Sequence, residues 1–211
     1  YLFLGNPGTG KTTVARRMGT MYKALGLLPD DTVVDCAASD LITGYTGQAG
    51  KKTKEMLQKA RGGVLFIDEA YQLDPSRGGS YMAEVVDELV KGLTSPEFQG
   101  KILVILAGYD QDMVRMLGTN PGLKSRFTER VHFQNLTPTA VVELLLACLK
   151  RRKMELAFAA DLDCGQKLLS MAVQLVNSNE FGNGRDVNTW VDMTYREVAN
   201  RSASLRRVKG G

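Results

Sequence analysis

A glycine-rich segment near the start of the chain constrains the fold more than any other feature. Residues 5–12 read GNPGTGKT and fit the pattern G-x-x-x-x-G-K-[ST], a glycine-rich turn that ends in lysine and a hydroxyl residue. An apolar, strand-like run, Tyr1–Leu4, precedes this segment. Apolar residues at helical spacing follow it, namely Val14, Met18, Met21 and Leu25. A strand, a turn and a helix in this order predict a site for a nucleoside triphosphate.

The residue types in this segment suit the binding of phosphate. Glycines let the backbone turn with its N–H groups aimed inward, and the positive end of the following helix adds to the attraction for an anion. Lys11 would reach the β- and γ-phosphates as a point charge, and Thr12 would offer its hydroxyl to Mg²⁺. We expect the nucleotide to be held by Asn6, Pro7, Gly8, Thr9, Gly10, Lys11, Thr12 and Thr13.

The composition allows a sizeable core and excludes several classes of protein. The 211 residues are 44% hydrophobic, enough for one domain and a smaller companion. The formal net charge of +4 neither demands nor excludes a nucleic-acid partner. The three cysteines are far apart, and the single His132 cannot build a histidine-bearing metal site. No apolar stretch is long enough to span a bilayer and no signal peptide is visible, so we expect an intracellular, soluble protein without membrane contact.

Up to about residue 135, short apolar runs alternate with helical stretches, which is typical of a parallel α/β sheet. The expected strands are Tyr1–Leu4, Thr32–Cys36, Val64–Ile67, Ile102–Ala107 and Arg130–Phe133. The expected helices are Thr12–Leu25, Gln48–Ala60, Tyr81–Leu93 and Gln111–Leu117, with loops at Asp74–Gly79 and Asn120–Gly122. We predict that residues 1–135 form a P-loop NTPase domain with a parallel sheet flanked by helices. Because the chain begins within a strand and without methionine, we expect a fragment that lacks the N-terminal edge of this domain.

The pattern changes after Phe133, where strand candidates end. Thr137-Pro138 is typical of an N-cap followed by proline at the first helical position, and it opens a helix through about Arg152. Further helices are expected near Gln166–Asn177 and Asp186–Arg206. We predict a small all-helical lid domain over residues 136–211. Apolar and aromatic residues of the last helix are expected to form its core, namely Val187, Trp190, Val191, Met193, Tyr195 and Val198.

A pair of carboxylates supplies the second half of the expected site. The segment GGVLFIDEAYQL ends the apolar strand Val64–Ile67 in Asp68 and Glu69. Ligands of open α/β sheets collect at the carboxyl ends of the strands. Asp68 is therefore expected to hold Mg²⁺, directly or through its waters, and Glu69 to orient or deprotonate the attacking water.

The segments GNPGTGKT, GGVLFIDEAYQL, VILAGYDQDM and NPGLKSRF occur in the order and spacing of an AAA+ ATPase. The sequences of these segments most resemble those of the CbbX/SpoVK-type group, which includes red-type Rubisco activases and sporulation proteins. The resemblance runs from residue 1 to about residue 195. It implies ATP as the nucleotide, a homo-hexamer as the active state and a protein as the substrate, with nucleic acid an unlikely partner.

The resemblance also assigns roles to individual residues. Arg126 in LKSRF matches the arginine finger that reaches a neighbouring subunit's site, and Arg130 is a second candidate for that role. Tyr109 and Asp110 follow a strand where this superfamily carries its sensor-1 residue, for which many members have asparagine. Either side chain is a candidate. Arg185 in GNGRDV resembles the sensor-2 arginine, which contacts the phosphates and reports the nucleotide state.

Tyr45-Thr46-Gly47 resembles the aromatic–x–glycine pore loop with which hexameric AAA+ proteins grip a polypeptide. An exposed tyrosine beside glycines can pack on varied side chains without sequence preference. We therefore predict an ATPase that remodels or unfolds a partner protein. One alternative is a nucleotide-gated scaffold with little turnover. The other is a nucleic-acid motor in which Tyr45 stacks on bases.

Overall fold

The computed structural model describes residues 1–42, 47–77, 79–154 and 162–209, with side chains up to Arg201 except that of Leu162. The chain divides into two compact units. The α/β unit holds Tyr1–Asn6 and Gly10–Phe133. The helical unit holds Gln134–Gly211 together with Pro7–Thr9, so the tip of the glycine-rich turn is part of the helical unit.

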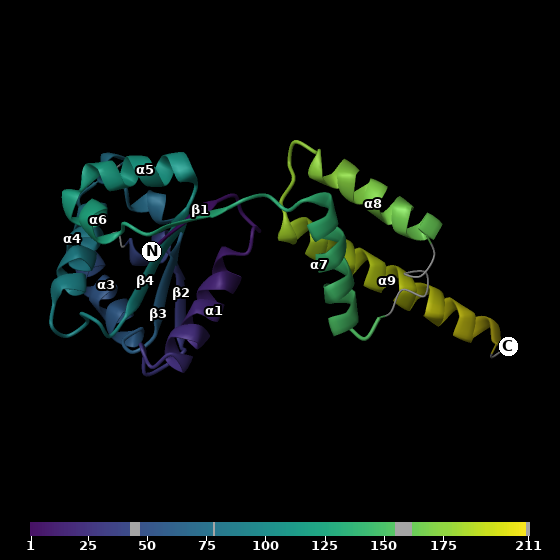
Figure 1. Cartoon of the computed structure of the whole chain (residues 1–211), viewed down its shortest axis with the longest axis horizontal. Helices are drawn as coiled ribbons and strands as arrows, with labels where there is room; N and C mark the ends of the chain where they lie inside the picture. The colour runs from purple at the N-terminus through teal and green to yellow at the C-terminus, as the bar shows by residue number, and fades with distance from the viewer. Residues whose placement is uncertain (43–46, 78, 155–161, 210–211) are drawn as a thin grey trace. The chain divides into compact units, whose positions relative to one another are not determined.

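Among the described residues of the α/β unit, five parallel strands form one sheet in the order β2-β3-β4-β1-β5 (Figure 1). The strands are β1 (Leu2–Gly5), β2 (Val33–Ala37), β3 (Val64–Asp68), β4 (Leu103–Gly108) and β5 (Arg130–Phe133). Since the strands are parallel, the glycine-rich turn after β1 and the acidic pair after β3 leave the same edge of the sheet, with the end of β4 between them. This architecture confirms the predicted parallel α/β sheet.

The α/β unit surrounds its sheet with α-helices and short 3₁₀ turns. The helices are α1 (Lys11–Ala24), α2 (Ala38–Leu41), α3 (Gln48–Lys59), α4 (Ser80–Thr94), α5 (Asp110–Thr119) and α6 (Pro121–Arg126), and the 3₁₀ turns are η1 (Ala70–Leu73) and η2 (Pro75–Arg77). The predicted loop at Asn120–Gly122 was wrong, because α6 begins there. Asn120 Oδ1 accepts hydrogen bonds from the N–H groups of Gly122 and Leu123, and Pro121 is the first residue of the helix.

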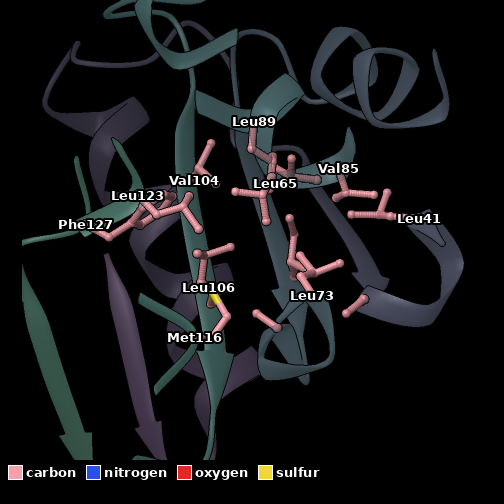
Figure 2. Packing of buried hydrophobic residues seen from close by; sticks show 14 of the residues in the cluster. Leu41, Leu65, Leu73, Val85, Leu89, Val104, Leu106, Met116, Leu123 and Phe127 are labelled. Carbon is pink, nitrogen blue, oxygen red and sulfur yellow. The ribbon is translucent and has the colours of Figure 1, made fainter. Parts of the chain in front are cut away.

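The sheet is covered on both faces, so its strands alternate between two apolar cores. Leu65 of β3 and Leu106 of β4 belong to a large core with residues of α2–α6. Figure 2 shows this core, in which Leu41, Val85, Leu89, Met116 and Leu123 also lie. Phe66 and Ile105 point to the opposite face, where they pack with Ala15 of α1. Burial on both faces explains why β1, β3 and β4 are nearly continuous apolar runs.

Helix α1 packs on the sheet through its small residues. Ala15 and Gly19 are buried, whereas Val14, Met21 and Leu25 of the apolar pattern are 38%, 49% and 64% exposed. A Cβ at Gly19 would lie 3.2 Å from the carbonyl oxygen of Asp31 and from a methyl of Val64. Close approach of the backbone to β3 therefore favours glycine here, because any Cβ would make tight contacts.

In the helical unit, α7 (Pro138–Arg151) packs against both α8 (Leu162–Val176) and α9 (Gly184–Lys209). Thr137 caps α7, since its hydroxyl accepts a hydrogen bond from the N–H of Ala140. The core of this unit consists of Val141, Leu145, Cys148, Leu149, Ala172, Val187 and Val191.

The expected core of the last helix was correct only in part. Val187 and Val191 are buried and Trp190 packs against them, but Met193, Tyr195 and Val198 are 64%, 49% and 47% exposed. The guanidinium of Arg152 lies 5.6 Å from the ring centroid of Tyr195, so this tyrosine has a cation–π partner at the surface. No helix in the described part of the chain is long and apolar enough to cross a membrane.

Candidate nucleotide-binding and hydrolysis site

Lys11 stands at the junction between the glycine-rich turn and α1. Its side chain is 8% exposed, and its Nζ donates hydrogen bonds of 2.9 Å to the carbonyl oxygens of Gly5 and Asn6. These bonds keep the ammonium at the beginning of the turn. Burial reduces the screening by water, so a buried ammonium attracts a bound anion more strongly than an exposed one does.

The first turn of α1 fits a phosphate group. Gly10 precedes the helix with a φ of +98°, although a Cβ there would meet nothing within 4 Å. The glycine therefore serves the backbone conformation and not close packing. The first intrahelical bond runs from the N–H of Val14 to the carbonyl of Gly10. The N–H groups of Lys11, Thr12 and Thr13 thus precede the helical ladder and suit an anion.

The tip of the turn, Pro7–Thr9, makes its described contacts within the helical unit. The carbonyl oxygen of Pro7 accepts a hydrogen bond of 3.2 Å from Nδ2 of Asn183, and that of Gly8 accepts one of 2.9 Å from the N–H of Gly184. Gly8 has a φ of +74°, and a Cβ there would lie 2.2 Å from the carbonyl oxygen of Gly182. Any larger residue at position 8 would therefore displace this contact.

Asp68 and Glu69 occupy different environments at the end of β3. Asp68 is half-buried, and its Oδ1 accepts a hydrogen bond of 2.9 Å from the N–H of Glu69. Glu69 is exposed and adopts the left-handed conformation, with a φ of +52°. Its Oε2 accepts a hydrogen bond of 2.6 Å from Nε2 of Gln72. The sequence analysis missed Gln72, whose only signal is its position three residues after the acidic pair.

The donor set fits Mg²⁺. Thr12 and Asp68 offer a hydroxyl and a carboxylate, the oxygen ligands that this ion prefers. No group of three or more His, Cys, Asp or Glu side chains suited to a metal occurs among the described residues. Mg²⁺ needs no such group, because it retains waters and shares the oxygens of a bound nucleotide.

The two sensor-1 candidates point to different partners. The ring of Tyr109 lies 5.5 Å from the ring of Tyr71, centroid to centroid. Tyr71 follows Glu69 by two residues in the sequence. Burial and then the charge of Glu69 raise the pKa of Tyr71. Asp110 instead lies 3.1 Å from Nδ1 of His132 on β5.

The arginine candidates are exposed. Arg126 is the last residue of α6, where its Nη1 donates hydrogen bonds to the carbonyl of Gly122 and the hydroxyl of Ser125. Arg130 begins β5, as expected, and is also exposed. Arg185 is exposed in the first turn of α9, within the helical unit.

The expected pore loop falls largely outside the described residues, which exclude Tyr45 and Thr46. Gly47 is described and caps α3 with a φ of +81°. Its N–H donates to both carboxylate oxygens of Glu84, at 3.1 and 3.2 Å. Glu84 of α4 therefore fixes the start of α3.

Comparison with known proteins places these features in a family. The family described as "ATPase family associated with various cellular activities (AAA)" matches residues 1–135. The crystal structure of the FIGL-1 AAA domain in complex with ADP has a TM-score of 0.60 over 88% of this chain and 56% of that chain. At 21% identity, this likeness shows a shared fold.

Relatives with closer sequences cover almost the whole chain. Stage V sporulation protein K of Bacillus subtilis (strain 168) is 35% identical over 202 residues, which are 95% of this chain and 61% of that protein. The chloroplastic ribulose bisphosphate carboxylase/oxygenase activase of Cyanidioschyzon merolae is 34% identical over 94% of this chain and 66% of its own length. ESX-1 secretion system protein EccA1 of Mycobacterium tuberculosis (strain ATCC 25618 / H37Rv) is 38% identical over 68% of this chain and 25% of that protein.

The chain thus spans less than two thirds of the length of these relatives. The predicted resemblance to the sporulation and Rubisco activase group is confirmed by the first two of them. Because the family match covers residues 1–135 of 211, the chain belongs to the AAA family of ATPases.

Proposed function

We propose that this AAA domain hydrolyses ATP in a homo-hexameric ring and that the whole protein uses the cycle to remodel a partner protein. The observation that carries the proposal is the position of two chemical groups on one sheet. The turn that leads to Lys11 and the pair Asp68-Glu69 leave the same edge of the parallel sheet. This is the edge at which α/β folds bind ligands.

Each residue has a task in hydrolysis. The N–H groups of the turn and the ammonium of Lys11 bind the phosphates, while Thr12 and Asp68 hold Mg²⁺, which neutralises developing phosphate charge when bound. Glu69 orients the attacking water and accepts its proton. The hydrogen bond from Gln72 limits the orientations open to the Glu69 carboxylate.

Arg126 and the sensor candidates complete the proposed site. Arg126 is exposed and its described contacts lie within its own helix, which suits a residue that acts on a neighbouring copy of the chain. Arg130 is the alternative. Of the two sensor-1 candidates, Tyr109 is favoured because Asp110 is paired with His132. Arg185 acts as sensor 2 from the first turn of α9, in a lid domain over residues 136–211.

The names of the relatives concern sporulation, carboxylase activation and secretion. Work on a protein partner is the simplest role shared by these contexts. Tyr45, with Thr46 and Gly47, is proposed to grip that partner.

Changing Glu69 to Gln tests the proposed hydrolysis. The amide cannot accept the proton of the attacking water, so the ATPase rate falls by about 10²–10⁴ while ATP binding is retained. Glu55→Gln, an exposed position on α3, is the matched control and keeps the wild-type rate. If the wild type binds ATP but turns it over no faster than Glu69→Gln, the nucleotide-gated scaffold becomes the better account.

Changing Tyr45 to Ala tests the grip on a polypeptide. The probe is a fluorescent protein with an unstructured tail, whose loss of fluorescence reports unfolding. Tyr45→Ala is expected to keep the ATPase rate but to lose the ability to unfold the fluorescent protein. The substitution removes the aromatic side chain that contacts the polypeptide and leaves the nucleotide site unchanged. Tyr195→Ala, an exposed tyrosine of α9, serves as the control. Equal unfolding by wild type and Tyr45→Ala would remove Tyr45 from the mechanism.

A further inference from the structure

Asn183 is a fully buried polar residue that the motif analysis did not single out. Its side chain is 0% exposed, and its φ of +56° places it in the left-handed region just before α9. A buried amide is costly unless its donors and acceptor are satisfied. Asn183 therefore has a hydrogen-bonding task that an ordinary loop residue does not have.

The amide of Asn183 connects three segments of the helical unit. Its Oδ1 accepts a hydrogen bond of 2.8 Å from the N–H of Leu136, which lies in the segment before α7. Its Nδ2 donates to Oδ1 of Asn135 at 3.1 Å and to the carbonyl oxygen of Pro7 at 3.2 Å. One side chain thus joins the tip of the glycine-rich turn, the segment before α7 and the start of α9.

The residues around Asn183 hold it in place. The N–H of Gly184 donates to the carbonyl of Gly8 at 2.9 Å, beside the bond from Asn183 to Pro7. The N–H of Gly182 donates to Oδ2 of Asp186 at 2.8 Å, which links the segment before α9 to the first turn of that helix. The tip of the turn therefore contacts an ordered helix start through two successive carbonyl groups.

These two bonds determine where the amide groups of the turn point. In a planar trans peptide the C=O and N–H groups point in opposite directions, and the described chain has no cis peptide bonds. The carbonyls of Pro7 and Gly8 point toward Asn183 and Gly184, so the N–H groups of Gly8 and Thr9 point away from them. These two N–H groups belong to the turn whose amides bind phosphate.

We propose that Asn183 is a positioning residue for the nucleotide: by holding the carbonyl of Pro7, it orients the N–H of Gly8 toward the phosphates. The inference rests on the proposed binding of ATP at the glycine-rich turn. It also links nucleotide binding to the segment before α7, because the side-chain amide of Asn183 accepts a hydrogen bond from the N–H of Leu136. The conformation of that segment and the affinity for nucleotide are then coupled, and the coupling is reciprocal.

Two substitutions remove the bond to Pro7 and differ in whether an acceptor for the N–H of Leu136 is kept. Asn183→Asp keeps an acceptor for the N–H of Leu136 but loses both donors, and it turns a carboxylate oxygen toward the carbonyl of Pro7. Asn183→Gly removes the whole side chain and retains the left-handed backbone without strain. Asn179→Gly, an exposed position in the turn before α9, is the control for added chain flexibility.

The experiment measures the binding of fluorescently labelled ATP and the ATPase kinetics of the folded proteins, with folding checked by circular dichroism. Both Asn183 variants lose affinity by about tenfold, because a buried partner of the turn is left unpaired. Their KM rises to match while kcat at saturating ATP stays within about twofold, since Glu69 is untouched. Asn179→Gly binds like the wild type.

The outcomes separate this inference from the proposed function. Folded Asn183 variants with wild-type affinity would overturn the role of Asn183 and leave the ATP site standing. Loss of the fold in both variants would also overturn it, since Asn183 would then serve folding and not the nucleotide. A wild type that binds no nucleotide would overturn the proposed function, and the inference with it.

Discussion

At the scale of single residues, Glu69 combines a proposed catalytic role with an unfavourable backbone conformation. Among the described non-glycine residues, only Glu69, Lys153 and Asn183 have a positive φ. The left-handed region costs a side chain with a Cβ about 1–2 kcal/mol relative to glycine. Strain of this kind is retained where a function requires the position of the side chain.

This strain predicts an inverted order of stability at position 69. Glu69→Gly is expected to have a free energy of unfolding about 1 kcal/mol higher than Glu69→Ala, because only glycine adopts the left-handed conformation without cost. Both variants lack the carboxylate, so their difference reports the backbone alone. Chemical denaturation measures it.

Position 72 provides the control for that comparison. Gln72 lies in the 3₁₀ turn η1, where φ is not positive, so Gln72→Gly is expected to be less stable than Gln72→Ala. If position 69 shows the same order as position 72, Glu69 does not carry backbone strain.

The motif located Asp68 and Glu69 but not their geometry. A strand that ends in Asp-Glu indicates where two carboxylates lie, because strand ends share an edge of the sheet. The left-handed φ of Glu69 and its bond to Gln72 depend on the path of η1, which the apolar pattern does not encode. Asn183 was missed for a similar reason, since Gly-Asn-Gly is typical of any exposed turn.

At the scale of elements, the apolar pattern of α1 predicts that a helix forms but not which of its residues are buried. The pattern of Val14, Met18, Met21 and Leu25 correctly predicted a helix. The buried positions are instead Ala15 and Gly19, with Lys11 at the start of the helix. Small residues give no strong apolar signal, yet they let α1 lie close to β3 and so set the direction of its N-terminus.

Gly19→Leu is expected to destabilise the α/β unit. The new side chain would meet the carbonyl of Asp31 and the side chain of Val64, and overpacking of this kind costs about 1–3 kcal/mol. Thr20→Leu places the same side chain one residue further, at an exposed position, and is expected to change stability little. Urea denaturation with a constant m-value measures both. Equal stability of the two variants would show that α1 does not depend on close approach at Gly19.

Helix α6 shows that residue types alone do not distinguish a turn from the start of a short helix. The expected strands agree with β1–β5 to within about one residue at each end, a shift that assignment methods themselves show. Helix α6 was predicted as a loop because Asn, Pro and Gly are typical of turns. The same three residues begin a helix here, because Asn120 supplies the cap and Pro121 the first position.

At the scale of the whole molecule, the α/β unit supplies the acidic pair and most of the glycine-rich turn, and the helical unit includes the tip of that turn. Under the proposed function, Arg126 is a further contribution from another copy of the chain. Arg126 is exposed at the end of α6, and its described hydrogen bonds lie within that helix.

The most direct test of this account mixes two inactive variants. Lys11→Ala removes the ammonium from a subunit's own site but keeps its Arg126, whereas Arg126→Ala keeps the site but offers no finger. Each alone is expected to lose most ATPase activity, by about 10³–10⁵ for the arginine. In mixed rings, verified by mass, some sites pair an intact Lys11 with an intact Arg126. A rate well above that of either variant supports a shared site, and no recovery in verified mixed rings would contradict it.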